Sequence, residues 1–399
     1  MKDRVILHVD MNAFFASVEA LFHPETAGKA MAVAGDPENR RGIILAKNEL
    51  AKKAGVQTAE PIWQARRKCP GLILLPPHHD LYEEYCIRAN EIYRRFSDLT
   101  EQAGIDESYL DVTGSEHIFG SGEKTADAIR AAVKEELGLT VSVGVSFCKV
   151  FAKMGSDLRK PDKTSVISRE NYRDILYPLP VTNLMFVGKA TAKTLAGLGV
   201  RTIGQLAAIR ENDLAALLGK HGRLLYAYAH GLDNEPVRRA DDARDVKSIG
   251  NSLTFRRDLV SLNDISVGLR ALSESVAYRL RRHGKKCYGV QVSIKDPSFS
   301  TIDRQVRLPG PTHLARTIHA AALDLVRRSW KPGKPIRLLA VTAIGLTGES
   351  DGGQMALFED NSVAKQEALE KSIDELRQKY GKHVIKPASV LHNDLGIGT

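Results

Sequence analysis

The sequence is poor in the features that mark secreted, zinc-binding and membrane proteins. Its four cysteines are widely spaced and form no Cys-x-x-Cys pair, so neither a disulfide framework nor a zinc site is indicated. No apolar run approaches the roughly 18 residues of a membrane-spanning helix, and no secretory signal precedes the first predicted strand. We therefore expect a protein of the reducing cytoplasm that does not span a membrane, and we expect it to be a monomer.

Charge is plentiful but unevenly distributed. The 399 residues include 57 Lys and Arg and 48 Asp and Glu, for a net charge of +9. Residues 247–347 alone hold 18 Lys and Arg against 6 Asp and Glu, a balance of +12. This pattern favours a polyanionic partner, nucleic acid or an anionic membrane, bound mainly by one domain. The length suggests two to four domains, at about 100–200 residues each.

Three carboxylates stand at positions that suit metal chemistry. Asp106 and Glu107 directly precede an alternating strand pattern, where their side chains can converge only at a bend. Asp10 ends a short apolar strand ahead of a helical pattern. Taken singly, Asp10 could be a helix N-cap and the pair an exposed turn. Together they suit catalysis by two divalent ions about 3.5–4 Å apart.

Two segments, Val9–Glu19 and Ile105–Thr113, resemble the palm motifs of Y-family DNA polymerases. The resemblance is closest to the DinB-like branch, the bacterial DNA polymerase IV enzymes. It continues through Gly144–Lys153 and Ser156–Pro161, and then through most of the remaining chain. It implies an α+β multidomain, right-hand polymerase fold with a palm, small fingers, a helical helix-hairpin-helix thumb and an α+β little-finger domain.

The resemblance also implies the order of domains along the chain. The predicted boundaries are 1–22 and 78–168 for the catalytic palm, 23–77 for the fingers, 169–235 for the thumb, 236–246 for a linker, 247–347 for the DNA-binding little finger, and 348–399 for the tail.

The family's chemistry is template-directed, low-fidelity translesion synthesis, in which dNTPs are added to a primer 3′-hydroxyl by two-metal-ion catalysis. By resemblance, two Mg²⁺ would be held by Asp10, Asp106, Glu107 and the backbone carbonyl of Met11. A nucleotidyl cyclase can share paired acids and a palm-like fold, but it does not explain the strongly basic domain. A catalytically inactive accessory protein, recruited to the sliding clamp, is the other alternative.

The resemblance assigns several residues to the incoming dNTP. Phe15 matches the steric gate, a ring under the sugar that would collide with a 2′-hydroxyl, and Phe14 beside it is a core residue that also borders the nucleotide. Lys160 would reach the β- and γ-phosphates. Where the family usually carries a Tyr and an Arg on the triphosphate, this sequence has Glu49 and Lys52. A lysine is a phosphate-binding point charge without the bidentate fork of arginine.

Contacts to primer-template DNA are predicted in two places. A hairpin at Val187, Gly188 and Lys189 would let backbone N–H groups approach a phosphate, although Phe186 replaces the family's usual first glycine. In the basic domain, whose charge suits phosphate contact, the candidates are Arg256, Arg257 and Arg304.

The tail carries a candidate partner motif. The pentapeptide Gln354–Phe358 matches the family's motif for the bacterial sliding clamp (its β subunit), in which Gln354, Leu357 and Phe358 enter a pocket. A helix is predicted from about Val363 to Tyr380, with an apolar stripe. The sequence does not reveal what this helix packs against.

Overall fold

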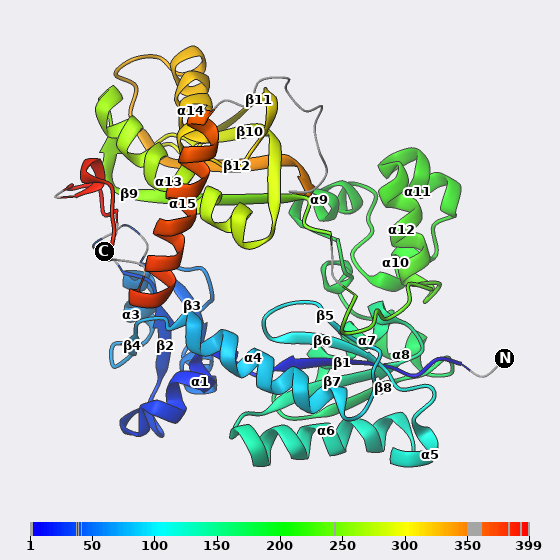
Figure 1. The fold of residues 1–399 in the computed structure, drawn as a ribbon. Helices are drawn as coiled ribbons and strands as arrows, with labels where there is room; N and C mark the ends of the chain where they lie inside the picture. The colour runs from blue at the N-terminus through cyan, green and yellow to red at the C-terminus, as the bar shows by residue number, and fades with distance from the viewer. Residues whose placement is uncertain are drawn as a thin grey trace. The chain divides into compact units, whose positions relative to one another are not determined.

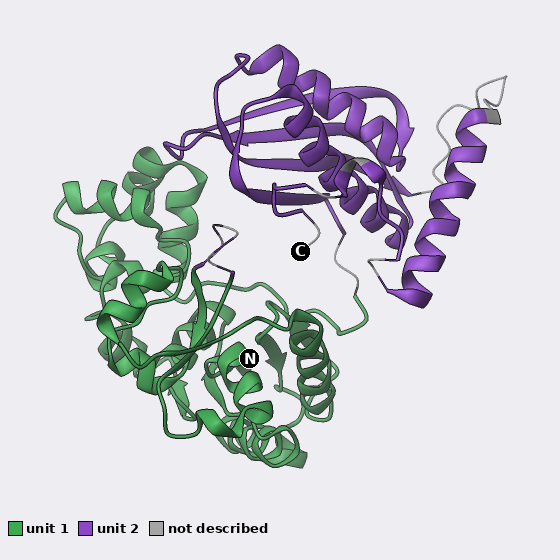
Figure 2. Cartoon of the chain, turned by 90° about the vertical axis from the view of Figure 1, so that its left-hand side faces the viewer, with its two compact units in different colours: residues 1–35, 43–243 green, residues 36–42, 244–399 purple. Residues whose placement is uncertain are grey.

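The computed structural model describes residues 3–36, 38, 40, 42–242, 245–348, 361–381, 384–391 and 393–397. The chain forms two compact units, residues 1–35 with 43–243 and residues 36–42 with 244–399 (Figure 2). Each unit contains its own sheets, helices and apolar core. Within the described part of the chain, no helix is both long and apolar enough to span a bilayer.

A five-stranded sheet is the centre of the first unit. Its strand order is β5-β6-β1-β7-β8. The strands are β1 (Ile6–Met11), β5 (Thr100–Gln102), β6 (Glu107–Asp111), β7 (Val141–Ser146) and β8 (Thr164–Ile167). All of β1 is buried, as its apolar sequence predicts, and it pairs antiparallel with both neighbours. The register places Asp10 directly opposite Glu107.

Helices cover both faces of this sheet (Figure 1). One face packs on α1 (Phe14–Phe22), α4 (His79–Arg94) and α6 (Gly122–Leu137). The opposite face packs on α7 (Lys149–Leu158). Because side chains alternate along a strand, Val9 of β1 enters the α4–α6 core while His8 and Asp10 point toward α7. The sequence pattern predicts a helix at 124–136 and a strand at 140–145, and α6 and β7 confirm both.

α7 lies unusually close to the sheet because two glycines meet there. A Cβ on Gly144 of β7 would lie 1.9 Å from the Ala152 carbonyl oxygen and 2.5 Å from the Ser156 nitrogen. A Cβ on Gly155 of α7 would lie 3.0 Å from the Gly144 Cα. The helix backbone therefore rests directly on the strand, and this contact sets how far the α7 side chains reach.

A three-stranded sheet forms the fingers of the first unit, in the order β3-β2-β4. Its elements are β2 (Met31–Ala34), β3 (Ile44–Lys47), β4 (Ile73–Leu75), α2 (Glu49–Lys53) and α3 (Ile62–Lys68). One sheet face packs on α1 and the other on α2 and α3. The sequence predicts a strand at 43–45 and a helix at 48–54, and β3 and α2 confirm both. The Asn48 side chain accepts from the Ala51 N–H as the N-cap of α2.

Short helices complete the first unit. They are α5 (Glu116–Phe119), α8 (Tyr172–Leu176), α9 (Lys189–Gly197), α10 (Ile203–Ala207), α11 (Glu211–Leu218) and α12 (Lys220–Ala229). In the hairpin before α9, Phe186 has φ of 66° and an exposed ring. This left-handed conformation is one that glycine adopts at no steric cost, so the sequence departure from glycine places local strain at this turn.

The second unit is an antiparallel sheet backed by helices. Its strand order is β11-β10-β12-β9. The elements are β9 (Ser248–Leu259), α13 (Leu262–Arg282), β10 (Lys285–Lys295), β11 (Thr301–Thr312), α14 (Ala315–Ser329), β12 (Ile336–Gly348) and α15 (Asn361–Tyr380). The sequence predicts strands at 288–294 and 336–344 and helices at 266–283 and 311–330. β10, β12, α13 and α14 confirm these four elements, although α14 begins only at Ala315 because β11 continues to Thr312. With separate sheets and helices in both units, the α+β fold class is also confirmed.

The predicted tail helix forms as α15, but its apolar stripe is not what docks it. The stripe consists of Leu369, Ile373, Leu376 and Tyr380, and all of these except the half-buried Ile373 are exposed. The docked face is charged instead: Glu370 and Asp374 both bind the Arg281 guanidinium of α13, with 2.6 Å between Arg281 Nε and Asp374 Oδ2. Pairs of Glu367 with Lys286 and of Arg377 with Glu274 flank this contact. Buried charges of this kind require their partners.

Candidate active site

A cleft of about 400 Å³ opens in the first unit beside the end of β1. Its walls come from β1 and α1, from the fingers strand β3, from the turn before β6, and from α7 with the loop that follows it. The lining residues are Asp10, Met11, Ala13, Phe14, Phe15, Leu45, Ala46, Lys47, Thr58, Ile105, Asp106, Glu107, Lys153, Asp157 and Lys160. Segments distant in sequence therefore meet here, and the three predicted acids meet with them.

The acids are fixed by backbone pairing. Asp10 and Glu107 face each other across the β1–β6 ladder. The carbonyl of Asp106 accepts from the Met11 N–H at 3.0 Å. In the tight turn before β6, the N–H groups of Ala103 and Gly104 both donate to the Glu107 carbonyl. This turn supplies the bend that two adjacent carboxylates need to approach Asp10 together.

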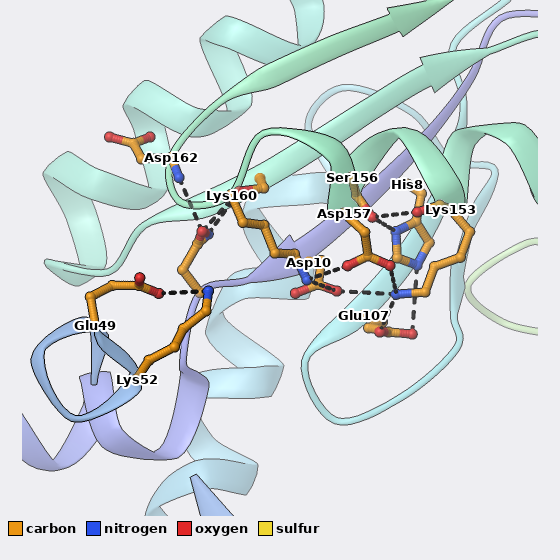
Figure 3. Close-up of polar contacts among 12 residues, drawn as sticks. His8, Asp10, Glu49, Lys52, Glu107, Lys153, Ser156, Asp157, Lys160 and Asp162 are labelled. Carbon is orange, nitrogen blue, oxygen red and sulfur yellow. Dashed lines mark hydrogen bonds and ion pairs between the residues drawn. The ribbon is translucent and has the colours of Figure 1, made fainter. Parts of the chain in front are cut away.

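Two lysines bind these carboxylates directly (Figure 3). Lys153 Nζ lies 2.6 Å from Glu107 Oε1 and 3.2 Å from Asp10 Oδ2. Lys160 Nζ lies 2.7 Å from Asp10 Oδ2 and 2.7 Å from Asp157 Oδ1. Asp10 thus accepts from two ammonium groups, and Asp10 and Glu107 converge on a single cation. The sequence could place Lys153 on a helix but could not show that it reaches the acids.

The pKa shifts follow from this crowding. Burial, and then the charges of Asp10 and Glu107, raise the pKa of Asp106. The pKa of Glu107 is held well below its ordinary range, first by His8 and then by Lys153. Burial lowers the pKa of His8 itself, so Lys153 is the cation that persists beside Glu107 at neutral pH. Of the three acids, Asp106 is therefore the one whose negative charge is neutralised least by the chain's own cations.

His8 connects the acids to α7. Its Nδ1 lies 2.8 Å from Ser156 Oγ, and that hydroxyl donates to the Lys153 carbonyl at 2.8 Å. Nε2 faces Glu107 Oε2 at 3.6 Å. The sequence analysis did not identify His8, since an isolated histidine in a buried strand carries no distinctive signal.

Phe15 is held rigidly at the cleft wall. Its ring stacks on Tyr82, with centroids 4.1 Å apart and planes 13° apart. The Tyr82 hydroxyl donates to the buried Glu19 carboxylate and accepts from the His78 N–H at 3.1 Å. Phe14 is buried in the core on the α4–α6 side and also borders the cleft. A ring anchored in this way can exclude a substituent on steric grounds.

The segment that carries Lys160 is fixed by Asn12. The Asn12 amide oxygen accepts from the Asp162 N–H at 3.0 Å and from Ser142 Oγ at 2.8 Å, while its NH₂ group lies 3.1 Å from the same hydroxyl. Arg130 holds the Asp162 carboxylate from the other side, at 2.9 Å. An aspartate could not donate to Ser142, so the amide at position 12 has a structural role that the sequence did not suggest.

The triphosphate contacts predicted in the fingers are only partly supported. Lys52 pairs with Glu49 at 3.3 Å and is half exposed, and the fingers lysine that the structure describes on the cleft wall is Lys47, whose Nζ donates to Thr58 at 2.9 Å. Burial lowers the pKa of Lys47. Lys52 remains a prediction, and Lys47 is the better-placed cation.

The predicted DNA contacts differ in their availability. Val187 is buried, whereas Gly188 and Lys189 are exposed at the start of α9. In the second unit, Arg304 is exposed on β11, as is Arg256 on β9. Arg257, however, already binds two carboxylates, those of Asp264 at 2.9 Å and Asp394 at 2.7 Å, with which a phosphate would have to compete.

Gln354, Leu357 and Phe358 lie outside the described residues. Their assignment to a clamp therefore remains a prediction from the sequence.

The donor set fits magnesium. Carboxylate and carbonyl oxygens are the ligands Mg²⁺ prefers, and Asp10 and Glu107 already share one cation. In the part of the chain that the structure describes, no three acidic, histidine or cysteine side chains form a complete metal cage. Mg²⁺ is commonly bound by one or two carboxylates plus substrate phosphates rather than by such a cage, so the arrangement suits a site completed by a nucleotide.

Comparison with protein-family models gives two matches. Residues 9–157 match the impB/mucB/samB family, and residues 246–357 match the impB/mucB/samB family C-terminal domain. The first match covers all three acids and every residue of the cleft lining except Lys160. The second covers the described sheet and helices of the basic unit up to β12.

Curated relatives match almost the entire chain. The DNA polymerase IV of Acetivibrio thermocellus is 43% identical over 395 residues, covering 99% of each chain. DNA polymerase IV 1 of Bacillus subtilis is 37% identical over 396 residues, covering 98% of this chain and 94% of that protein. Among solved structures, a Y-family DNA polymerase chimera of Dbh and Dpo4 matches with a TM-score of 0.76 and 25% identity, covering 85% of this chain and 98% of that one.

Proposed function

We propose, from the premise that the chain belongs to the impB/mucB/samB family of Y-family DNA polymerases, that its cleft adds deoxynucleotides to a primer end by two-metal-ion catalysis. Membership makes the chain a DNA-directed DNA polymerase of the DNA polymerase IV kind. The partners implied are primer-template DNA and dNTPs, and the process is translesion synthesis. A monomer in the cytoplasm is the expected setting.

One observation carries this proposal: Asp10 and Glu107 converge on a shared cation in the same cleft as Phe15 and Lys160. Asp10, Asp106, Glu107 and the Met11 carbonyl would hold Mg²⁺. When bound, the metal ions supply Lewis-acid activation of the primer hydroxyl and charge neutralisation at the phosphates. The raised pKa of Asp106 supports this assignment, because it indicates that the positive charge of the chain's own side chains does not balance the carboxylates of the cleft.

The chain's own side chains then have distinct tasks. Lys160, fixed through Asn12 and Asp162, places a positive charge beside Asp10, where charge on a departing pyrophosphate would be offset. Lys47 supplies a second cation from the fingers wall. Phe15, stacked on Tyr82, presents a rigid ring against the sugar and selects a 2′-deoxyribose by exclusion. Lys153 keeps Glu107 ionised and oriented.

The acids can be tested without changing side-chain size. Asp106→Asn and Glu107→Gln should abolish primer extension with Mg²⁺ and dNTPs, since each removes a ligand charge at the reaction centre. Both should still bind primer-template DNA in fluorescence anisotropy, because the second unit supplies most of the positive charge. Glu91→Gln, an exposed glutamate on α4 of the same unit, is the matched control. Full extension by both cleft variants would refute the metal site and favour the inactive accessory protein.

The sliding clamp is proposed as a further partner on the sequence of Gln354–Phe358. Tethering to a clamp would raise the effective concentration of the polymerase at the primer end. Replacing Gln354, Leu357 and Phe358 with Ala should leave extension without clamp unchanged and remove the gain seen with a loaded clamp. Stimulation that survives the triple change would show that the pentapeptide is a chance match.

A further inference from the structure

The fingers helix α3 presents an exposed aromatic residue beside two arginines that have no ion pair among the described residues. Trp63 is 64% exposed. Arg66 and Arg67 follow at the i+3 and i+4 positions, so they neighbour Trp63 on the helix surface. Both arginines are exposed, and neither makes an ion pair with any residue that the structure describes. Lys68 differs from them, because it binds Glu60.

Folding does not explain this surface. α3 is attached to the fingers sheet by the buried side chains of Ile62 and Ala65 on its other side. Trp63 takes no part in that core, and no ring or cation among the described residues covers its indole. A tryptophan left in water gains nothing for stability, since apolar surface stabilises the fold only when it is buried. The face is therefore available to bind a ligand.

The exposed face of α3 lies close to the cleft. Thr58 lines the cleft wall, and the chain then runs along the start of β3, with Ala59 N–H donating to Ile44 O at 2.8 Å and Ile44 N–H donating to Glu60 O at 2.9 Å. Trp63 comes five residues after Thr58, and five residues span at most about 17 Å. The exposed face of α3 thus begins a short distance from the site of the incoming nucleotide.

We propose that Trp63, Arg66 and Arg67 form a binding platform for single-stranded DNA, the unpaired template strand that leads into the cleft. A base stacks on the open indole while the two guanidinium groups bind the phosphates on either side. Aromatic stacking combined with cationic phosphate contact is the usual basis of sequence-independent single-strand binding. The charge favours this ligand over a membrane or an apolar protein surface, because α3 exposes cations and no acid.

The test uses the full-length protein and three primer-templates that share one duplex. One is blunt, one has an eight-nucleotide dT template overhang, and one has an overhang of eight abasic sites. The quantity measured is the affinity ratio of each overhang to the blunt duplex, by fluorescence anisotropy. For the unaltered chain the dT overhang should bind at least about fivefold more tightly than the blunt duplex, the usual scale of one stacked base, and more tightly than the abasic overhang.

Trp63→Ala should lower the dT ratio to the abasic value, and Trp63→Phe should keep most of it because a phenyl ring still stacks. Arg66→Ala with Arg67→Ala should lower both overhang ratios, since phosphates are present in each. Arg94→Ala, an exposed arginine of α4 without an ion pair among the described residues, is the matched charge control and should change neither.

Fluorescence gives a second readout, because the chain has two tryptophans. In a Trp330→Phe background Trp63 is the sole indole, and the dT overhang should quench it more than the abasic overhang does. A dT ratio that Trp63→Ala leaves unchanged would overturn the proposal. Equal quenching by the dT and abasic overhangs would also overturn the proposal. That result would favour a protein partner for this face of α3.

Discussion

The close approach of α7 to β7 allows the catalytic arrangement to be disturbed from a distance. Gly144→Ala adds a single methyl group that would lie 1.9 Å from the Ala152 carbonyl oxygen. Real Cβ contacts essentially never fall below 3.0 Å, so the helix must move away by about 1 Å. The obstacle is helix backbone, which cannot rotate aside as a flexible side chain can. Lys153 and Ser156 lie on the helix that moves.

The expected cost follows from that displacement. Overpacking a tight interface typically costs about 1–3 kcal/mol, and this contact should reach the upper end because both neighbours are backbone. A displacement of 1 Å in catalytic groups can lower the rate about 100-fold. Gly144→Ala should therefore reduce both the stability of the first unit and the rate of nucleotide addition.

Two other glycines give graded controls. Gly155→Ala meets the Gly144 Cα at 3.0 Å, a contact that needs only a few tenths of an ångström, and alanine in a helix interior gains about 1 kcal/mol over glycine. Its net effect should be small. Gly114→Ala meets nothing within 4 Å and should stay within about 0.5 kcal/mol of the unaltered chain.

Hydrogen exchange of the β7 and α7 peptides, together with single-turnover primer extension, measures both effects. The order of damage should be Gly144→Ala, then Gly155→Ala, then Gly114→Ala. If the Gly144→Ala variant shows the same hydrogen exchange and the same primer extension as Gly114→Ala, the α7–β7 interface accommodates a methyl group easily. The reasoning from backbone contact is then wrong.

Three further predictions concern the cleft and the tail helix. Phe15→Ala should raise the ratio of ribonucleotide to deoxynucleotide incorporation sharply, while Phe22→Ala at the exposed end of the same helix should not; an unchanged ratio would make Phe15 a core residue only. In steady-state kinetics, Lys160→Ala should raise the KM for dNTP more than Lys52→Ala does. The reverse order would show that Lys52 of the fingers helix makes the main triphosphate contact. Arg281→Ala should destabilise the second unit by about 3 kcal/mol, because the buried Glu370 and the partly buried Asp374 lose their cation; urea unfolding at the unaltered midpoint would contradict this.

The sequence predicted the acids because their signal is local. Asp10 ends an apolar strand, and Asp106 and Glu107 precede an alternating one, so strand periodicity and resemblance indicated the same residues. Lys153 differs, because its place in the sequence is compatible with a solvated helix charge as well as with a functional one. Its reach to Asp10 depends on the separation of α7 from β7, which two glycines set from different elements. No pattern within the helix itself reports that separation.

The tail helix shows the opposite case, a clear pattern that did not predict the docked face. The stripe through Leu369 and Leu376 has helical spacing, yet both side chains are exposed. Glu370 and Asp374, which read as ordinary solvated charges, are the groups that bind Arg281. Periodicity identifies the helix, but the choice of face depends on a cation contributed by α13.

The same contacts change what the basic charge of the second unit can do. Residues 247–347 carry +12 by sequence, and residues 348–399 carry 6 Lys and Arg against 9 Asp and Glu, a balance of −3. Four of these acids pair with cations of the second unit: Glu370 and Asp374 with Arg281, Glu367 with Lys286, and Asp394 with Arg257. A phosphate can recruit these three cations only by displacing a carboxylate, so they should release few counterions on binding DNA. The described tail acids therefore lower the number of unpaired cations on the α13 side. If this unit binds DNA, we expect the phosphate contacts to come from cations without an ion pair among the described residues, such as Arg304.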